Sequence, residues 1–443
     1  MHYSKLGKLL ASSTIVAAVM TTTALTDDLS DAIAKDYSYL EPLFVHFHEN
    51  PELSFVETKT AERLAAELTS LGFTVTPGVG GTGIVAMMEN GDGPQVLVRA
   101  DMDGLPVKED SGVAYPSSVT QTNIDGIEMP VMHACGHDMH MTSLVGTARR
   151  LVAMRDQWSG TLMLIGQPAE ERIGGAKAMI EDNLYERFGR PDYALALHVA
   201  AGEPAGTVIY GSGLTYSSSD SVNIRVYGVG THGASPHLGN DPIVLASQIV
   251  GALQTLVSRE ISPLEAGIVT VGSFHAGRKH NIISDHADLQ LTVRSNDETV
   301  RAKLLQGIKR IAENMGRVAG LPDDKLPKVD LSVEATPVTY NNEALAARLG
   351  PVLERAFPGG TAPAVQRGMG AEDFPYFTNV TPPVPGFYFA VGGTSQADLD
   401  AEKNGGPRVA GHHSPFFKIE PEPSIKAGVR AMTLAVLELM PKK

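Results

Sequence analysis

Three short apolar segments of this chain each lead directly into side chains that can do chemistry. They are residues 95–100, before Asp101 and Asp103; residues 161–165, before Glu170 and Glu171; and residues 194–197, before His198. Apolar residues at helical spacing between Met141 and Val152 separate the first two segments. Strand–helix–strand order is typical of α/β folds, in which ligands bind beyond the carboxyl ends of the strands. We therefore expect these side chains to converge at one edge of a sheet.

Earlier residues predict a helix and a strand pair. Apolar residues between Ala61 and Leu71 recur at helical spacing, and Gly72 supplies a stop. Residues 83–88 and 95–100 are expected to pair with each other as strands across the turn-forming residues 90–94.

The pattern changes near Gly211 and predicts a second domain. An alternating strand at residues 222–226 is followed by two helical and two strand patterns, enough for a compact α+β unit. The predicted organisation is a leader of residues 1–26, a catalytic domain of residues 27–210 and 328–443, and an inserted domain of residues 211–327.

The first 26 residues resemble a secretory signal peptide. Lys5 and Lys8 precede an apolar stretch from Leu9 to Met20, and small residues follow as far as Ala24. The stretch is too short to span a bilayer comfortably, and no later segment approaches the required length of about twenty apolar residues. We expect cleavage after Ala24 and an exported, periplasmic or secreted protein without a membrane span. A retained leader would instead indicate a cytoplasmic protein.

The charge of the chain argues against a nucleic-acid partner. It has 36 basic and 50 acidic residues, a formal net charge of −14, and no run rich in Lys or Arg. Its single cysteine, Cys135, excludes an intramolecular disulfide. That thiol is therefore an inert buried group, a nucleophile or a metal ligand.

Several groups of metal-ligating type are present. Segment 133–140 holds Cys135 and three histidines, and residues 412–413 add two more. Cys, His and Glu together suit zinc and also admit manganese or cobalt. They exceed the needs of one tetrahedral ion, which favours two bridged ions that polarise a carbonyl and acidify a water. Adjacent Glu170 and Glu171 can point apart, so that one ligates and the other accepts a proton.

Taken singly, these features have simpler explanations. An isolated Glu-Glu pair is usually a solvated turn, and isolated histidines are usually structural or exposed. We interpret five histidines in that way: His2, His46, His48, His275 and His286. The Cys, His and Glu side chains indicate a metal site because several of them occur together at predicted strand ends. No single one of these residues would indicate it.

Seven segments carry a family resemblance. They are residues 50–55 (NPELSF), 99–106 (RADMDGLP), 132–140 (MHACGHDMH), 167–171 (QPAEE), 232–237 (HGASPH), 370–374 (GAEDF) and 413–415 (HSP). With them the chain resembles the amidohydrolase branch of the dinuclear-metal aminoacylase and carboxypeptidase superfamily. That branch includes hippurate hydrolases, N-acyl-L-amino acid amidohydrolases and plant auxin-conjugate hydrolases. The resemblance implies a mixed-sheet, metallopeptidase-like α/β catalytic domain with an inserted α+β lid domain through which the chain forms a homodimer.

The resemblance also implies a metal site. Two divalent ions, zinc or manganese with cobalt or nickel as alternatives, would be held by Cys135, His137, Glu171, His198 and His413. Asp101 stands where many superfamily members have a metal-binding histidine and is left out of this set. Asp103 is expected to orient a ligand.

The remaining roles follow the same resemblance. Glu170 would be the general base, and the lid residue His232 would stabilise the oxyanion, often in the partner subunit's site. Asn281 matches a lid residue that contacts substrate, and His237 is interpreted as structural.

The expected reaction is metal-dependent hydrolysis of the amide bond of N-acyl or N-aroyl, hippurate-like amino acids. A metal-dependent dipeptidase or carboxypeptidase of the same superfamily, acting on short peptides, is the main alternative. Two others are a thiol hydrolase that uses Cys135 with His137 or His133, and an exported binding protein without catalysis.

Overall fold

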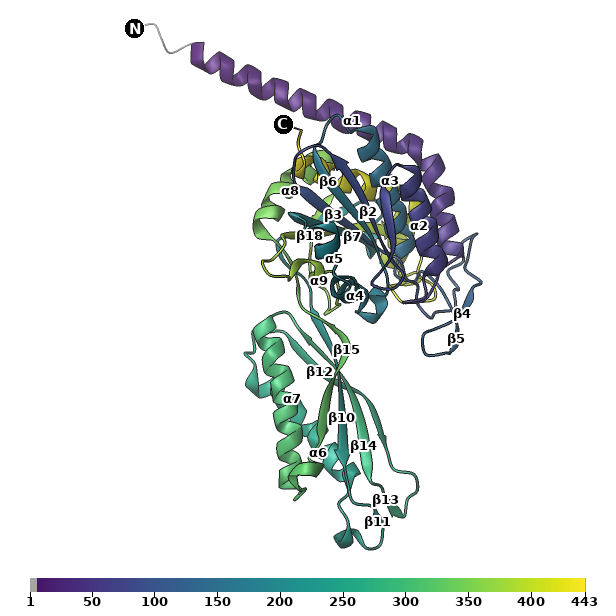
Figure 1. Ribbon diagram of the computed structural model, residues 1–443, viewed down its shortest axis with the longest axis vertical. Coiled ribbons are helices and arrows are strands. Elements are labelled where there is room, and N and C mark those ends of the chain that lie inside the picture. The colour runs from purple at the N-terminus through teal and green to yellow at the C-terminus, as the bar shows by residue number, and fades with distance from the viewer. Residues whose placement is uncertain (1–5, 443) are drawn as a thin grey trace.

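A mixed sheet of eight strands forms the larger part of the molecule (Figure 1). The computed structural model describes residues 6–442, and the side chains from residue 28 onward. In spatial order the strands are β1 (Thr74–Val79), β2 (Gly83–Asn90), β6 (Gly160–Gln167), β3 (Gln95–Asp101), β7 (Tyr193–Pro204), β18 (Gly386–Thr394), β8 (Val208–Tyr210) and β17 (Thr361–Pro363). The central strands β6, β3, β7 and β18 are parallel, whereas β1, β2 and β6 pair antiparallel. The predicted α/β class is confirmed.

Helices cover both faces of this sheet. One face and its main hydrophobic core carry α1 (Leu6–Glu49), α2 (Thr58–Ser70), α3 (His137–Ala153), α8 (Glu343–Ala356) and α11 (Pro421–Leu439). The other face packs against α4 (Gly175–Glu181), α5 (Leu184–Phe188) and α9 (Pro375–Thr378). Burial on both faces accounts for the continuous apolar character of the central strands.

The predicted pairing of residues 83–88 with residues 95–100 is wrong. Strand β6 lies between β2 and β3, antiparallel to β2 and parallel to β3. The local turn signal between residues 90 and 94 predicts a hairpin, but the later strand β6 pairs with both β2 and β3 and separates them. The predicted helix after residue 60 is confirmed as α2, in which Ala61, Leu64 and Leu68 are buried.

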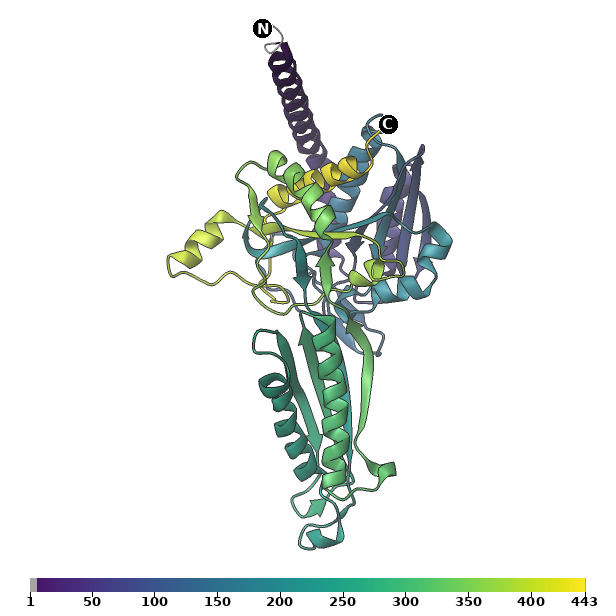
Figure 2. The ribbon, with the colours of Figure 1, turned by 90° about the vertical axis from the view of Figure 1, so that its left-hand side faces the viewer.

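A smaller α+β unit extends from the main body (Figure 1). Its four-stranded sheet has the order β12 (Gly267–Ala276), β14 (His286–Ser295), β10 (Ser218–Tyr227) and β15 (Lys328–Thr336). Figure 2 shows α6 (Pro242–Thr255) and α7 (Glu298–Val318) side by side on one face of this sheet. The unit has its own hydrophobic core, which includes Val222, Leu253 and Ile308.

The boundary predicted at residue 328 falls at the start of β15 rather than beyond its end. Strand β15 pairs antiparallel with β10 and so belongs to the smaller sheet. It is an edge strand with mostly exposed or half-buried side chains. Apolar residues alternate with polar ones along it, at Val329, Leu331, Val333 and Ala335. This pattern predicts a strand but does not reveal which sheet the strand joins.

Three short pairs and a surface helix complete the fold. They are β4 (Thr120–Thr122) with β5 (Glu128–Pro130), β9 (Gly213–Tyr216) with β16 (Thr339–Asn341), β11 (Thr231–His232) with β13 (Ile282–Ile283), and α10 (Gln396–Lys403). The pair β11 and β13 lies at the far tip of the smaller unit (Figure 1).

The predicted leader lies largely within α1, which runs without interruption from Leu6 to Glu49. The part of α1 that packs on the core includes Leu29, Ile33 and Leu40, all beyond the predicted cleavage point. Residues 1–5 of the leader lie outside the described residues. In the part of the chain that the structure describes, no helix combines the length and apolarity needed to cross a membrane.

Candidate metal and catalytic site

Three neighbouring strands bring the predicted site together. Strands β6, β3 and β7 are adjacent and parallel, so their carboxyl ends lie at one sheet edge. Asp101 ends β3, and Glu170 follows β6 within the 3₁₀ turn η1 (Glu170–Arg172). His198 lies within β7. The expected convergence of these segments is confirmed by the strand order.

Gly136 shapes the turn between Cys135 and His137. It has φ 88° and precedes the first turn of α3. A Cβ atom at this position would lie 2.3 Å from Cγ1 of Val199, so the close approach of this loop to β7 requires glycine. The turn therefore holds the thiol of Cys135 and the imidazole of His137 against the end of β7.

Asp103 connects His137 with both glutamates. Its Oδ1 atom lies 3.3 Å from Nδ1 of His137 and accepts the backbone N–H of Glu170 at 3.1 Å. Its Oδ2 atom accepts the backbone N–H of Glu171 at 3.1 Å and the hydroxyl of Ser54 at 2.7 Å. These contacts leave Nε2 of His137 directed toward the glutamates, 3.8 Å from Oε1 of Glu171.

Burial disfavours the charged form of His137, but Asp101, Asp103 and Glu171 outweigh it and raise the pKa of His137 to about 10. Nε2 of His137 and Oε1 of Glu171 are buried and have no hydrogen bond to another described residue. Buried polar groups are normally satisfied, so these orphaned atoms point to a missing partner such as a cation.

A strained turn presents Glu170 and Glu171. Ala169 has φ 47°, a left-handed conformation that non-glycine residues rarely adopt. Its N–H donates to Oε1 of Glu57 at 2.7 Å. Burial, followed by the charges of Glu372 and Glu171, raises the pKa of Glu170 well above its usual value. Burial also raises the pKa of Glu171 to about 8.

Cys135 and His198 form a contact of ligand type. The Sγ atom lies 3.4 Å from Nε2 of His198, whose Nδ1 lies 2.6 Å from the carbonyl of Val199. Because a carbonyl only accepts, Nδ1 carries the proton and the lone pair of Nε2 faces the thiol. Burial and neighbouring histidines lower the pKa of His198 well below its usual value.

The acid–base state of Cys135 opposes a thiol hydrolase. Burial, then the charges of Glu171 and Glu170, raise the pKa of Cys135 well above its usual value. A catalytic cysteine needs the opposite, an electropositive surrounding that stabilises its thiolate. His198, which contacts the thiol, is held neutral and therefore supplies no imidazolium that would stabilise a thiolate.

His413, which comes from the C-terminal segment, is the fifth predicted metal ligand at this site. Its N–H donates to the carbonyl of Ala134 at 2.8 Å, and its Nε2 lies 3.3 Å from Oε2 of Glu171. His413 has φ 65°, a second strained position at the site. Its side chain is 56% exposed, so this corner opens to solvent.

The five predicted ligands fall into two triads that share Cys135. Ligand atoms of Cys135, His137 and His198 lie within 4.8 Å of one another, as do those of Cys135, Glu171 and His413. Sulfur, imidazole and carboxylate donors suit zinc and other divalent transition metals. Together with the orphaned atoms, this donor set fits a site in which these five residues would hold two divalent ions.

Both carboxylate oxygens of Asp101 contact other protein groups, in agreement with the omission of Asp101 from the predicted ligand set. Its Oδ2 accepts from Arg99 at 2.7 Å and its Oδ1 lies 2.6 Å from Nδ1 of His140. The other nitrogen of His140 accepts the N–H of Val199 at 2.8 Å. Both groups are therefore occupied by protein partners.

Sequence reasoning missed a buried charge network next to Glu170. Arg99 is fully buried and contacts Glu372 at 2.7 Å and Asp373 at 3.4 Å. Oxygen atoms of Glu170, Glu372 and Asp373 lie within 4.8 Å of one another. An arginine inside an apolar strand pattern, as at residues 95–100, is the signal that could have indicated it, because a buried arginine requires carboxylate partners.

The structure does not bring His232 and Asn281 to this group. His232 ends β11 and Asn281 directly precedes β13, and Figure 1 places both strands at the tip of the smaller unit. His232 is exposed, and its Nδ1 accepts the N–H of Ala234 at 3.0 Å. His237 lies on an exposed turn of the same tip. Within one chain, the predicted oxyanion group therefore lies apart from the predicted base.

Comparisons with known proteins agree with this site. Residues 97–438 match peptidase family M20/M25/M40. The chain is 34% identical to thermostable carboxypeptidase 2 of Saccharolobus solfataricus, over 94% of this chain and 100% of that protein. It is 37% identical to hippurate hydrolase of Campylobacter jejuni, over 74% of this chain and 82% of that protein.

Among solved structures, the fold is similar to the Bacillus subtilis YXEP protein, a dinuclear metal binding peptidase from the M20 family. The TM-score is 0.72 at 26% identity, over 91% of this chain and 98% of that one. The resemblance drawn from the motifs is confirmed. The chain belongs to peptidase family M20/M25/M40 and is a metal-dependent amidohydrolase.

Proposed function

We propose that this protein hydrolyses the amide bond of N-acyl or N-aroyl amino acids and releases a carboxylic acid and a free amino acid. The observation that carries the proposal is the position of Glu170. An oxygen of this buried carboxylate lies 4.0 Å from Nε2 of His137. Glu170 also forms a candidate ligand group with His137 and Glu171 and another with Glu372 and Asp373, but it belongs to neither of the two triads that share Cys135. A carboxylate that lies beside a metal site without binding the metal is suited to accept and donate protons.

The residues of the site have separate roles in the proposed reaction. Cys135, His137, Glu171, His198 and His413 would hold two divalent ions. When bound, such ions polarise a carbonyl and lower the pKa of a water. Glu170 takes a proton from the attacking water onto a carboxylate oxygen and then gives it to the nitrogen of the leaving amine, so that the base is regenerated. Asp103 and Glu57 hold the turn that aims Glu170.

A second copy of the chain would supply His232 and Asn281. We propose a homodimer through the smaller unit, which then acts as a lid for the partner's site. The separation of β11 from the metal-ligand candidates within one chain supports this arrangement (Figure 1). Oxyanion stabilisation requires a donor within hydrogen-bond distance of the reacting carbonyl, and one chain alone does not provide His232 there.

Mixing two inactive variants tests the dimer. In Glu170→Gln and His232→Ala heterodimers, one of the two sites has both native residues if His232 acts across the interface. Activity should then return to about a quarter of the wild-type level after subunit exchange. No recovery, together with dimers detected by light scattering, would place His232 in its own subunit's site.

The substrate is tested with a panel of N-acyl amino acids, hippurate-like amides and dipeptides, followed by mass spectrometry. Protein treated with chelator should be inactive and regain amino-acid release with zinc or manganese. Release from dipeptides alone would favour the peptidase alternative, which the similarity to a carboxypeptidase supports. Metal binding without release from any compound would favour a binding protein.

Export is a separate proposal, supported by the charge and hydropathy pattern of the first 26 residues. Intact-mass measurement of the protein from its native source checks it. A mass that begins after Ala24 is expected, and a full-length chain would contradict export through this leader.

A further inference from the structure

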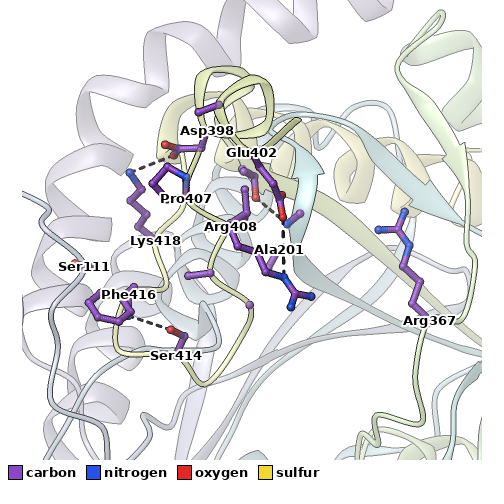
Figure 3. A pocket seen from close by; sticks show the side chains of 16 residues that line it. Ser111, Ala201, Arg367, Asp398, Glu402, Pro407, Arg408, Ser414, Phe416 and Lys418 are labelled. Carbon is purple, nitrogen blue, oxygen red and sulfur yellow. Dashed lines mark hydrogen bonds and ion pairs between the residues drawn. The ribbon is translucent and has the colours of Figure 1, made fainter. Parts of the chain in front are cut away.

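A cavity of about 910 Å³ lies beside the metal-ligand candidates. Its wall includes Ala201 and Gly202 of β7, and Gly411 and Ser414 on the two sides of the His412–His413 pair. Figure 3 shows the lining side chains. The volume is in the range of sites for small molecules. None of the five metal-ligand candidates lines the cavity, which borders the site through the segments that carry His198 and His413.

The cavity presents arginines from two segments. Arg408 follows α10, and Arg367 comes from the segment before Glu372 (Figure 3). The Arg408 side chain is 92% exposed, and its Nε lies 4.0 Å from Glu402, beyond hydrogen-bond distance. Arg367 is 73% exposed and contacts Glu203 at 2.7 Å.

The third cation of the cavity is already neutralised, since Lys418 contacts Asp398 at 3.1 Å. Arg408 is therefore the lining cation with the weakest protein partner. Its guanidinium group presents N–H donors in the planar geometry that matches a carboxylate. The carboxylates of Asp398 and Glu402 also line the cavity, so its charges are mixed and Arg408 is the cation that remains most available to a ligand.

We propose that this cavity binds a second carboxylate of the substrate through Arg408. The inference rests on the proposed function, because it concerns the substrate of the same site. The carboxylate could belong to the acyl half, as in an N-succinyl amino acid, or to the amino-acid half, as in an N-acyl glutamate. Val409 and Phe416 supply apolar contacts for the carbon chain that carries it.

Two matched substrate pairs test the proposal. N-succinyl-L-alanine is compared with its terminal amide, and N-acetyl-L-glutamate with N-acetyl-L-glutamine. Each pair differs only in a carboxylate against an amide. In one pair, kcat/KM should favour the carboxylate by about 10- to 100-fold, the range of a charge-assisted hydrogen bond. The pair that shows the preference identifies the half of the substrate that enters the cavity.

Arg408→Gln should bring this ratio close to one. Lys403→Gln is the matched control, because Lys403 is an exposed cation at the end of α10 that does not line the cavity. It removes the same charge and should leave the ratio unchanged. A preference absent from both pairs, or one that survives Arg408→Gln, overturns the proposal.

Calorimetric titration separates this inference from the proposed function. The metal-loaded Glu170→Gln variant is titrated with the same four compounds, and its double variant with Arg408→Gln serves for comparison. In one pair, the compound with the carboxylate should bind more tightly than its amide, and this difference should disappear in the double variant. That result supports the cavity assignment even if no compound is hydrolysed. Equal binding of both members in each pair overturns it, even if N-acyl amino acids are substrates.

Discussion

The Oε1 atom of Glu57 accepts a hydrogen bond of 2.7 Å from the backbone N–H of Ala169. The same atom accepts the N–H of Phe55 at 2.9 Å, and the hydroxyl of Thr82 donates to the other oxygen. Glu57 is fully buried. One carboxylate therefore holds the left-handed residue that precedes the proposed general base.

Replacing Glu57 by Leu should release this turn. It leaves the N–H groups of Ala169 and Phe55 unsatisfied, which costs about 1–3 kcal/mol each in the free energy of unfolding. We expect lower thermal stability together with a reduced kcat, measured by calorimetry and steady-state kinetics. Glu57→Gln is the control, since its carbonyl oxygen can still accept both bonds. Equal activity in the Leu variant and the wild type would show that the turn does not depend on Glu57.

Glu170→Gln should lower kcat by about 10²–10⁴-fold, the usual contribution of a general base. The metal content, measured by mass spectrometry of the metal, should not change, because Glu170 is not among the proposed ligands. Retained activity in this variant would remove Glu170 from the mechanism.

Cys135→Ser should lose metal and activity together, because Cys135 belongs to both triads. Bound metal stabilises the folded state by about 2.7 kcal/mol at a hundred times its Kd, so chelator should lower the Tm of the wild type. The Tm of Cys135→Ser should respond much less. Loss of activity with full metal content would instead support a nucleophilic cysteine.

Gly136→Ala should disturb the site without changing any ligand. The φ of 88° disfavours a side chain, and the added Cβ would lie 2.3 Å from Val199. Strain of this kind costs about 1–3 kcal/mol. We expect reduced metal affinity and a lower Tm. Gly91→Ala serves as a control, since φ is 81° there and the Cβ would meet open space. Equal effects of both substitutions would mean that backbone strain alone, rather than the contact with Val199, is responsible.

His48 joins the end of α1 to α3 and should make stability depend on alkaline pH. Its Nδ1 lies 2.7 Å from Asp138 and its Nε2 3.0 Å from Glu109. Burial disfavours the imidazolium, but these carboxylates outweigh it and raise the pKa of His48 to about 10. The resulting stabilisation is complete below the ordinary pKa of about 6.5 and is lost as the pH rises through 10.

Removing one partner of such a buried pair costs about 3–5 kcal/mol. His48→Gln should therefore be less stable than the wild type at pH 6, with a difference that narrows above pH 10. Thermal unfolding from pH 6 to 10.5 measures the difference, with His275→Gln at an exposed position as control. A difference that does not vary with pH would mean that His48 is not charged in the folded protein. The expectation that His48 is structural is consistent with this buried position.

The sequence by itself determined the local elements and most of the chemistry. Helical spacing located α2 and α3, because the burial of one helix face imposes a period that is visible in a single segment. Polar groups that follow the three apolar segments 95–100, 161–165 and 194–197 indicated a site, because parallel strands end at a common edge. The candidate ligands then came from residue types together with the motifs that resemble the family.

Only the tertiary structure decided how distant segments meet. Strand β6 separates β2 from β3, β15 joins the smaller sheet, and Arg99 meets Glu372 across 273 positions of the chain. It also decided that His232 lies at the tip of the smaller unit rather than beside Glu170 within its own chain. Strand order and ion pairing of this kind depend on contacts between segments far apart in the chain. No local period or turn signal records them, because each segment satisfies its own pattern equally well beside a different neighbour.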